Sequence, residues 1–231
     1  MAGRHSRMCF IMTLSLIMVL TPVCGAEVCD SSEVPPFDRA LMFPYSKPLS
    51  LVSDVTQSIS VLAPALFALA APTSDWVGIA MLYGASSVLS FGTRTLLKST
   101  IDRSRPYTYA VDPPTAPPIG EYDHDRSFPS GHTIMAFTGA AFTHTLFALR
   151  YPESRWRMPV TSAAWTFAAA TAILRVASGN HFVTDVLAGA AIGTFFGAVV
   201  PYLASRADYV WKRDNVSMYI GPTAVALHVR Y

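Results

Sequence analysis

The sequence Arg175-Val-Ala-Ser-Gly-Asn-His181-Phe-Val-Thr-Asp185 joins two apolar runs, residues 158–174 and 186–205. Each run has about the length that a helix needs to cross a bilayer core, so the polar residues between them predict a turn at one membrane face. If a helix starts directly after His181, Asp185 lies one turn away and reaches the imidazole. A carboxylate on one ring nitrogen fixes the tautomer and leaves the other nitrogen free to attack an electrophile. Because the planar guanidinium of Arg175 suits oxyanions, the stretch predicts a nucleophile, its orienter and an anion clamp.

The composition indicates a membrane-embedded protein of one domain. The 231 residues are 52% hydrophobic and only 14% charged, with a mean hydropathy of +0.35, whereas soluble domains carry about 25% charged residues. The net charge of +2 is too small to indicate a nucleic-acid partner. The alternative is a soluble all-helical protein with buried apolar helices, since Ala, Gly, Ser and Thr are frequent in the runs.

The apolar runs predict an all-α, polytopic membrane helix bundle of about six spans. Besides the two runs named above, they cover residues 8–26, 55–72, 76–93 and 133–149. The first run follows Arg4 and Arg7 and is either a signal peptide cleaved after Ala26 or an uncleaved membrane helix. Residues 27–205 then form the main domain. Residues 206–231 form a tail, in which an alternating pattern around Gly221-Pro222 predicts a short β-hairpin.

The charges beside the predicted spans indicate an orientation. With the N-terminus inside, the loop at residues 150–157 and the tail from residue 206 fall in the cytoplasm, and both are rich in basic residues. Cytoplasmic loops typically carry such an excess of positive charge. The long loop at residues 98–132 and the turn at residues 178–180 then both face outward. All residues with candidate chemistry are therefore predicted on the extracytoplasmic side.

Two further clusters lie in the long outward loop. Lys98 and Arg105 are seven residues apart, or two turns, so a helix would place both on one face. Ser130 and Gly131 open the next span, where exposed backbone N–H groups and the positive end of the helix favour an anion. His132, in the first turn, is a candidate proton donor. Taken singly, the basic pair is also typical of an interfacial anchor, and Ser130 is also typical of an N-cap.

The three clusters together fit phosphoryl transfer. Cations and amide N–H groups neutralise phosphate oxygens while an in-line nucleophile displaces the leaving group. A neutral imidazole is a competent nucleophile near neutral pH, since its ordinary pKa is about 6.5. No metal or other cofactor is predicted, because Lys98, Arg105 and Arg175 supply the positive charge.

The motifs Lys98-x6-Arg105-Pro106, Pro129-Ser130-Gly131-His132 and Arg175-x5-His181-x3-Asp185 resemble the three-part signature of the type 2 phosphatidic acid phosphatase (PAP2) superfamily. Order and spacings match, although Leu174 stands where the family usually has Ser. The resemblance implies an all-helical core and a covalent phosphohistidine on His181, oriented by Asp185, with His132 as the acid for the leaving group. It also implies that phosphate is bound by Lys98, Arg105, Ser130, Gly131 and Arg175.

By this resemblance, we expect a metal-independent phosphatase of membrane lipids in the bacterial inner membrane, with its site facing the periplasm. Lipid A phosphates, phosphatidylglycerol phosphate, phosphatidic acid and polyprenyl diphosphate all fall within the resemblance. The signal- or anchor-like first segment favours an envelope lipid such as lipid A. Two alternatives stay open: a soluble periplasmic acid phosphatase of the same superfamily, and a membrane protein that binds or transports phosphorylated lipids without catalysis. The oligomeric state stays open as well.

Three secondary features complete the interpretation. Gly189, Gly193 and Gly197 give the last span a bare face for close helix contact, either within the monomer or at a dimer seam. Arg103 and Arg126 are interpreted as headgroup contacts or as surface residues. The proline-bearing loop at residues 107–128 is expected to form a lid that selects the substrate.

Overall fold

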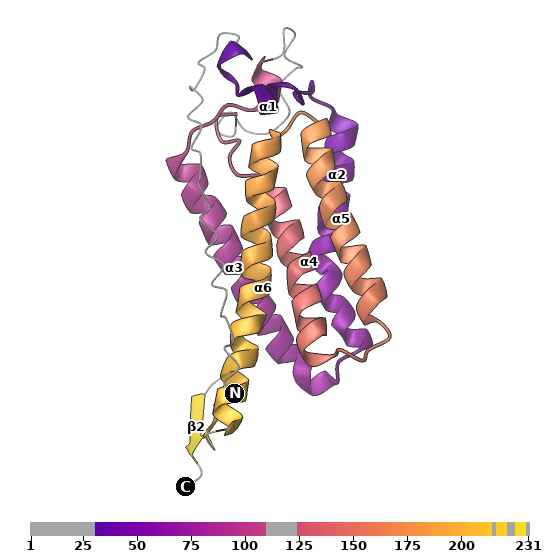
Figure 1. Cartoon of the computed structure of the whole chain (residues 1–231), viewed down its shortest axis with the longest axis vertical. Helices are drawn as coiled ribbons and strands as arrows, with labels where there is room; N and C mark the ends of the chain where they lie inside the picture. Colours follow the sequence, from indigo (N-terminus) through magenta and orange to yellow (C-terminus); the bar gives the residue numbers. More distant parts are fainter. Residues whose placement is uncertain (1–30, 110–123, 214–215, 221–224, 230–231) are drawn as a thin grey trace, which may run out of the picture.

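The computed structural model describes residues 31–109, 124–213, 216–220 and 225–229. The predicted first segment at residues 8–26 and the centre of the 107–128 loop lie outside these ranges. Helices dominate the described chain, which confirms the all-α prediction (Figure 1). The helices are α1 (Pro36–Arg39), α2 (Lys47–Leu62), α3 (Trp76–Thr100), α4 (Gly131–Arg150), α5 (Arg157–Ala177) and α6 (Val183–Arg213). Short 3-10 turns cover Ser31–Glu33, Ala63–Leu69, Thr73–Asp75 and Pro106–Tyr109.

α4 is the central helix of the bundle. It packs against α2, α3, α5 and α6, as its place among these helices in Figure 1 illustrates. Twelve of its 20 residues are buried, many of them Gly, Ala or Thr. The small residues let the neighbouring helices approach α4 closely.

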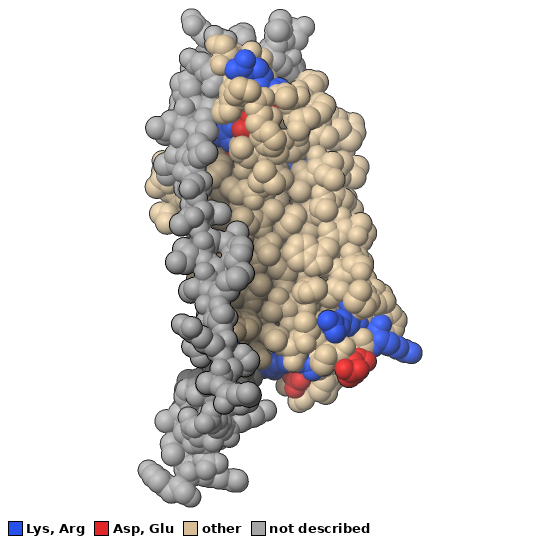
Figure 2. All heavy atoms as spheres, in the orientation of Figure 1, with Lys and Arg blue, Asp and Glu red and all other residues tan. Residues whose placement is uncertain are grey.

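Within the described residues, four segments are long and apolar enough to cross a membrane: Lys47–Phe67, Thr73–Thr100, Arg157–Ala177 and Val183–Arg206. α4, which contains the predicted span at residues 133–149, is not among them, since it carries two histidines and several threonines. Figure 2 shows charged residues gathered at the two ends of one face, with an uncharged band between them. Large apolar side chains are exposed on these helices, including Val88, Leu96 and Ile173. The protein is a multi-pass membrane protein.

The glycine face of α6 packs against α4 within the monomer, which confirms one of the two predicted uses. A Cβ atom at Gly193 would lie 2.2 Å from the carbonyl oxygen of Ile134. One at Gly197 would lie 2.6 Å from the carbonyl oxygen of Thr138. No side chain fits at such distances, so glycine allows the two backbones to approach closely. This approach brings the N-terminal ends of α4 and α6 together.

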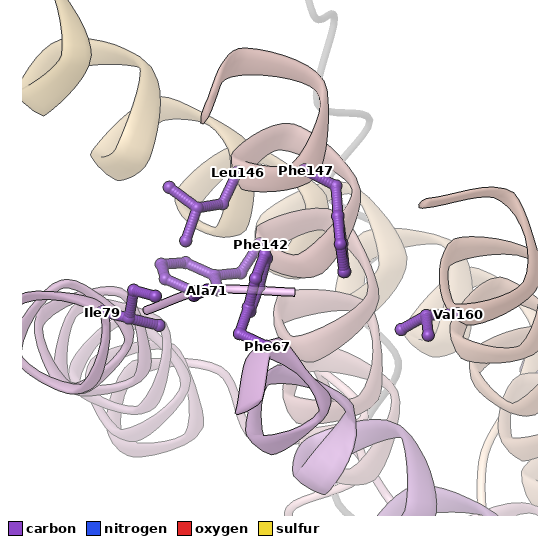
Figure 3. Packing of buried hydrophobic residues seen from close by; sticks show 7 residues of the cluster. All are labelled: Phe67, Ala71, Ile79, Phe142, Leu146, Phe147 and Val160. Atoms are coloured by element: carbon purple, nitrogen blue, oxygen red, sulfur yellow. The ribbon is translucent and has the colours of Figure 1, made fainter. Parts of the chain in front are cut away.

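An apolar core closes the other end of the bundle. Phe67 and Phe147 stack with ring centroids 4.3 Å apart. Figure 3 shows the cluster, which draws on the turn after α2, on α3, on α4 and on α5: Phe67, Ala71, Ile79, Phe142, Leu146, Phe147 and Val160. Burial of large aromatic side chains is the strongest apolar contribution available to such a bundle. This core holds the helices together at the end of the bundle opposite the N-terminal ends of α4 and α6.

The tail contains the expected β-hairpin. β1 (Val216–Ile220) and β2 (Val225–Val229) pair antiparallel, with Val216 opposite Val229. The break predicted at Gly221-Pro222 lies between the strands, outside the described residues.

Candidate active site

The three sequence clusters meet at one end of the bundle. Their residues lie at the C-terminal ends of α3 and α5, at the N-terminal ends of α4 and α6, and in the adjoining loops. A cavity of about 490 Å³ opens there. Six of the predicted site residues line it: Lys98, Arg105, Gly131, His132, Arg175 and His181. Arg105 and Arg175 thus share a single cavity with the imidazole of His181.

Lys98 and Arg105 reach this cavity by a different route from the one expected. The prediction that one helix carries both is wrong, because α3 ends at Thr100 and Ile101 is extended. From there the chain runs beside residues 124–127, with Arg103 N–H donating to the Asp125 carbonyl at 2.8 Å. Lys98 points back from the last turn of α3 and donates to the Arg126 carbonyl at 2.5 Å. The loop, rather than helical periodicity, therefore brings the two cations together.

The turn between α5 and α6 holds His181. Gly179 has a φ of +70°, and a Cβ there would lie 2.5 Å from the carbonyl oxygen of Phe43. Only glycine fits this left-handed position against the segment that precedes α2. Arg105 Nη1 donates to the Asn180 carbonyl at 3.2 Å, which ties the long loop to the same turn.

His181 faces Asp185, as the spacing predicts. Its Nδ1 lies 3.6 Å from Oδ2 of Asp185. That oxygen also accepts hydrogen bonds from the Ser127 hydroxyl at 2.5 Å and from the Phe182 N–H at 3.0 Å. The Ser127 hydroxyl is in turn 3.5 Å from Nδ1 of His181. Since Nδ1 faces this polar group, Nε2 on the other side of the ring is the candidate nucleophile.

Ser130 and Gly131 have different surroundings. Gly131 lines the cavity, and Arg94 packs where its Cβ would be. Ser130 is fully buried, and its N–H donates to the Asp185 carbonyl at 3.1 Å. Its hydroxyl accepts a hydrogen bond from Thr133 at 2.9 Å. Ser130 therefore links α4 to α6, while Gly131 faces the space where a phosphate would lie.

α2 holds Arg175 and His132 in place. Arg175 Nη1 donates to the Ser53 hydroxyl at 2.9 Å and to Oδ1 of Asp54 at 3.1 Å. The same Asp54 oxygen lies 3.1 Å from Nε2 of His132. Asp54 is about half exposed and lines the cavity. Its carboxylate therefore contacts one group that the motifs assign to phosphate binding, Arg175, and one that they assign to the leaving group, His132.

Burial and positive charge favour the neutral form of His181. Its ring is almost fully buried, and this burial lowers the pKa well below 6.5. The charges of Arg105 and Arg175 lower the pKa further, with smaller effects from Lys98 and His132. A neutral imidazole keeps the lone pair that nucleophilic attack requires.

Comparison with known proteins identifies the family. Residues 79–209 match the sequence profile of the PAP2 superfamily. The chain belongs to this superfamily. Over 143 residues, 60% of the chain, it is 30% identical to the lipid A 1-phosphatase of Rhizobium johnstonii and covers 52% of that protein. It is 32% identical to the lipid A 1-phosphatase of Rhizobium etli over 143 residues and covers 55% of that protein. The chain thus spans about half the length of these curated relatives.

The PAP2 fold is also seen among solved structures. The chain is similar to the crystal structure of a transmembrane PAP2-type phosphatidylglycerolphosphate phosphatase from Bacillus subtilis. The TM-score is 0.50 at 24% identity, and the match covers 74% of this chain and 83% of that one. This likeness supports the membrane helix bundle.

Sequence reasoning missed several residues around the PAP2 motifs. Asp54 directly precedes the predicted span at residues 55–72, and Arg94 directly follows the one at residues 76–93. Both spans were bounded at a charged residue, yet α2 and α3 continue through these positions. Charged residues within membrane helices usually face a polar cavity, and that rule could have identified both.

Arg103 is the clearest correction. The sequence interpretation placed it at a lipid headgroup or on the surface, but only 4% of it is exposed. Its guanidinium forms ion pairs with Asp185 and with Asp38 on α1. Arg126, by contrast, is exposed, in line with the surface alternative. Arg103 is therefore a buried ion-pair partner of Asp185 in the PAP2 site.

Proposed function

We propose that this protein is a phosphatase that removes a phosphate monoester, or a terminal phosphate of a diphosphate, from a membrane lipid through a phosphohistidine on His181. The observation that carries the proposal is a buried histidine, kept neutral and turned by Asp185, in a cavity lined by Lys98, Arg105 and Arg175. A cavity built only to bind phosphate needs the cations but not the paired imidazole.

The proposed reaction has two steps. Nε2 of His181 attacks phosphorus, the bond from phosphorus to the lipid oxygen breaks, and His132 gives that oxygen a proton. Burial and the charges of Arg175 and Arg105 lower the pKa of His132 to about 3, so His132 takes up this proton only when the phosphate dianion lies beside it and offsets those charges. Water then attacks the phosphohistidine and gives a proton to His132, while the phosphorus–nitrogen bond breaks to release inorganic phosphate. The three cations and the Gly131 N–H neutralise the phosphate oxygens in both steps, and Ser130 supports this end of α4.

The relatives support an envelope lipid, lipid A, as the substrate, with its 1-phosphate as the group removed. Two of them carry the name lipid A 1-phosphatase and are matched over 60% of the chain. The cavity lies at the opposite end of the bundle from the basic loop between α4 and α5. By the positive-inside rule, that loop is cytoplasmic and the cavity opens at the periplasmic face of the inner membrane.

The test compares His181→Ala with His144→Ala in detergent, using lipid A and measuring released inorganic phosphate. His144 is an exposed histidine on α4 that does not line the cavity, so its loss should leave the rate unchanged. We expect His181→Ala to abolish turnover and the phosphoenzyme trapped by acid quench, and a chelator to leave the wild-type rate unchanged. Equal phosphate release by the two variants would refute the mechanism.

The substrate is tested separately on the wild-type protein. Phosphatidic acid, phosphatidylglycerol phosphate and polyprenyl diphosphate are compared with lipid A by kcat/KM. A higher value for any of them than for lipid A would refute the lipid A assignment and leave the phosphatase mechanism intact.

A further inference from the structure

Asp38 is a buried carboxylate outside the signature motifs. It lies on α1 and is completely inaccessible to solvent. Its Oδ1 accepts the backbone N–H of Thr184 at 3.0 Å, and its Oδ2 accepts the Thr184 hydroxyl at 2.6 Å. In Figure 1, α1 lies over the start of α6. Asp38 therefore caps the first turn of α6, which also contains Asp185, the partner of His181.

Arg103 connects Asp38 to Asp185. Nη2 of Arg103 donates to Oδ2 of Asp38 at 2.7 Å, and Nη1 donates to Oδ1 of Asp185. Nη1 also donates to the Thr184 hydroxyl at 2.7 Å. The guanidinium carbon lies 4.3 Å from the centroid of the Phe182 ring, which fixes the plane of the fork. One buried arginine is thus shared between two buried carboxylates.

The two oxygens of Asp185 consequently have separate partners. Oδ1 faces Arg103, whereas Oδ2 faces Nδ1 of His181 and accepts the bonds from Ser127 and Phe182. The contact with Arg103 prevents rotation of the carboxylate. If Arg103 paired with Asp185 alone, its charge would weaken the interaction of Asp185 with the imidazole; sharing the charge with Asp38 limits that effect.

We infer that Asp38 and Arg103 are positioning residues for the nucleophile, acting on His181 through Asp185. The inference rests on the proposed function of His181. Neither Asp38 nor Arg103 lines the cavity, which contains the cations assigned to phosphate. Their loss should therefore slow the formation of phosphohistidine without weakening phosphate binding. Mutation of the partners that orient metal-binding histidines typically costs about 10- to 100-fold in affinity or activity, and we expect a loss of the same order for partners that orient a nucleophilic histidine.

The test compares Asp38→Asn with Asp102→Asn. Asp102 lies in the same loop as Arg103 and loses the same charge in its variant, but its side chain is exposed. Lipid A is the substrate, and inorganic phosphate is the inhibitor. For Asp38→Asn we expect kcat to fall about 10- to 100-fold, with KM and the Ki of phosphate within about twofold of wild type. Asp102→Asn should match wild type in all three.

A wild-type kcat in Asp38→Asn would overturn the inference. So would a rise in KM and Ki in proportion to the fall in kcat, because that result indicates a distorted cavity. If Asp38→Asn does not fold, Arg103→Lys tests the inference instead, since lysine keeps the positive charge but loses the planar guanidinium that contacts both carboxylates. A reduced kcat with an unchanged Ki of phosphate supports the inference, and a wild-type kcat overturns it. Activity in His181→Ala would instead refute the proposed function, whatever these variants show.

Discussion

Replacing Gly193 by alanine tests the helix contact that brings the site together. The new Cβ would lie 2.2 Å from the Ile134 carbonyl oxygen and 3.0 Å from Cβ of Phe137. Ordinary van der Waals contact begins at 3.4 Å, so α6 and α4 must separate by about 1 Å. Overpacking of this kind costs about 1–3 kcal/mol of unfolding free energy.

The same displacement acts on the site. His132 lies on α4, half a turn before Ile134, and Asp185 lies on α6, about two turns before Gly193. A misplacement of about 1 Å between catalytic groups costs about 100-fold in rate. We therefore expect Gly193→Ala to lower both the Tm in detergent and the kcat for phosphate release from lipid A.

Gly84→Ala is the matched control. It makes the same chemical change in the interior of α3, but no atom lies within 4 Å of the new Cβ. Alanine is the better helix former by about 1 kcal/mol, so this variant should be as stable as wild type or more stable, with unchanged kcat. If Gly193→Ala and Gly84→Ala behave alike in Tm and kcat, the close α4–α6 contact does not position the site.

Three further predictions concern charge and protonation. The pKa of His181 is held well below 6.5 in the folded protein, so just below pH 6.5 only the unfolded chain protonates this imidazole. The contribution of His181 to the unfolding free energy is therefore complete above about pH 6.5 and is lost by about 1.4 kcal/mol per pH unit as the pH falls. Unfolding free energy measured from pH 8 to 5 should consequently fall less steeply in His181→Gln than in wild type, and parallel curves would contradict this. Asp54 contacts Arg175 and His132 at 3.1 Å and so competes with phosphate for these groups; because an exposed ion pair is worth up to about 1 kcal/mol, Asp54→Asn should lower the Ki of inorganic phosphate by about two- to fivefold. An unchanged or higher Ki counts against this competition. His132→Ala should slow release from lipid A far more than from p-nitrophenyl phosphate, whose leaving group needs no proton, and an equal loss on both substrates would exclude His132 as the acid.

The sequence was sufficient to predict much of the end of the bundle that contains the candidate site. Two of the three motifs carry their own local geometry: a turn with Gly179 before His181, and a helix start at Gly131 beside His132. Apolar runs predicted each long helix, because a bilayer requires such runs. The face of Gly189, Gly193 and Gly197 predicted a close contact, and the structure identifies α4 as the partner.

The remaining features depend on contacts between distant segments. Nothing in the local pattern of Asp38 indicates that it caps α6, since its partner Thr184 lies 146 residues away. Helical spacing gave the wrong route for Arg105 because tertiary pairing with residues 124–127 overrides periodicity after Thr100. Helix boundaries drawn at charged residues excluded Asp54 and Arg94, whose charges are tolerated because they face a polar cavity rather than lipid.

In the proposed mechanism, a single set of charges accounts for both substrate attraction and activation of the nucleophile, His181. Among the described residues that line the cavity are five cations and one carboxylate, namely Lys47, Arg94, Lys98, Arg105, Arg175 and Asp54. This excess of positive charge favours a multiply charged anion such as a phosphate monoester. It also disfavours protonation of His181, so the imidazole is neutral when the substrate arrives. Asp185, in contrast, has its negative charge shared with Arg103 and directed by hydrogen bonds, so that it orients the ring without neutralising the cavity. In the proposed mechanism, the separation of these two charge systems, one lining the cavity and one behind the histidine, lets the same site attract an anion and keep an unprotonated ring nitrogen beside it.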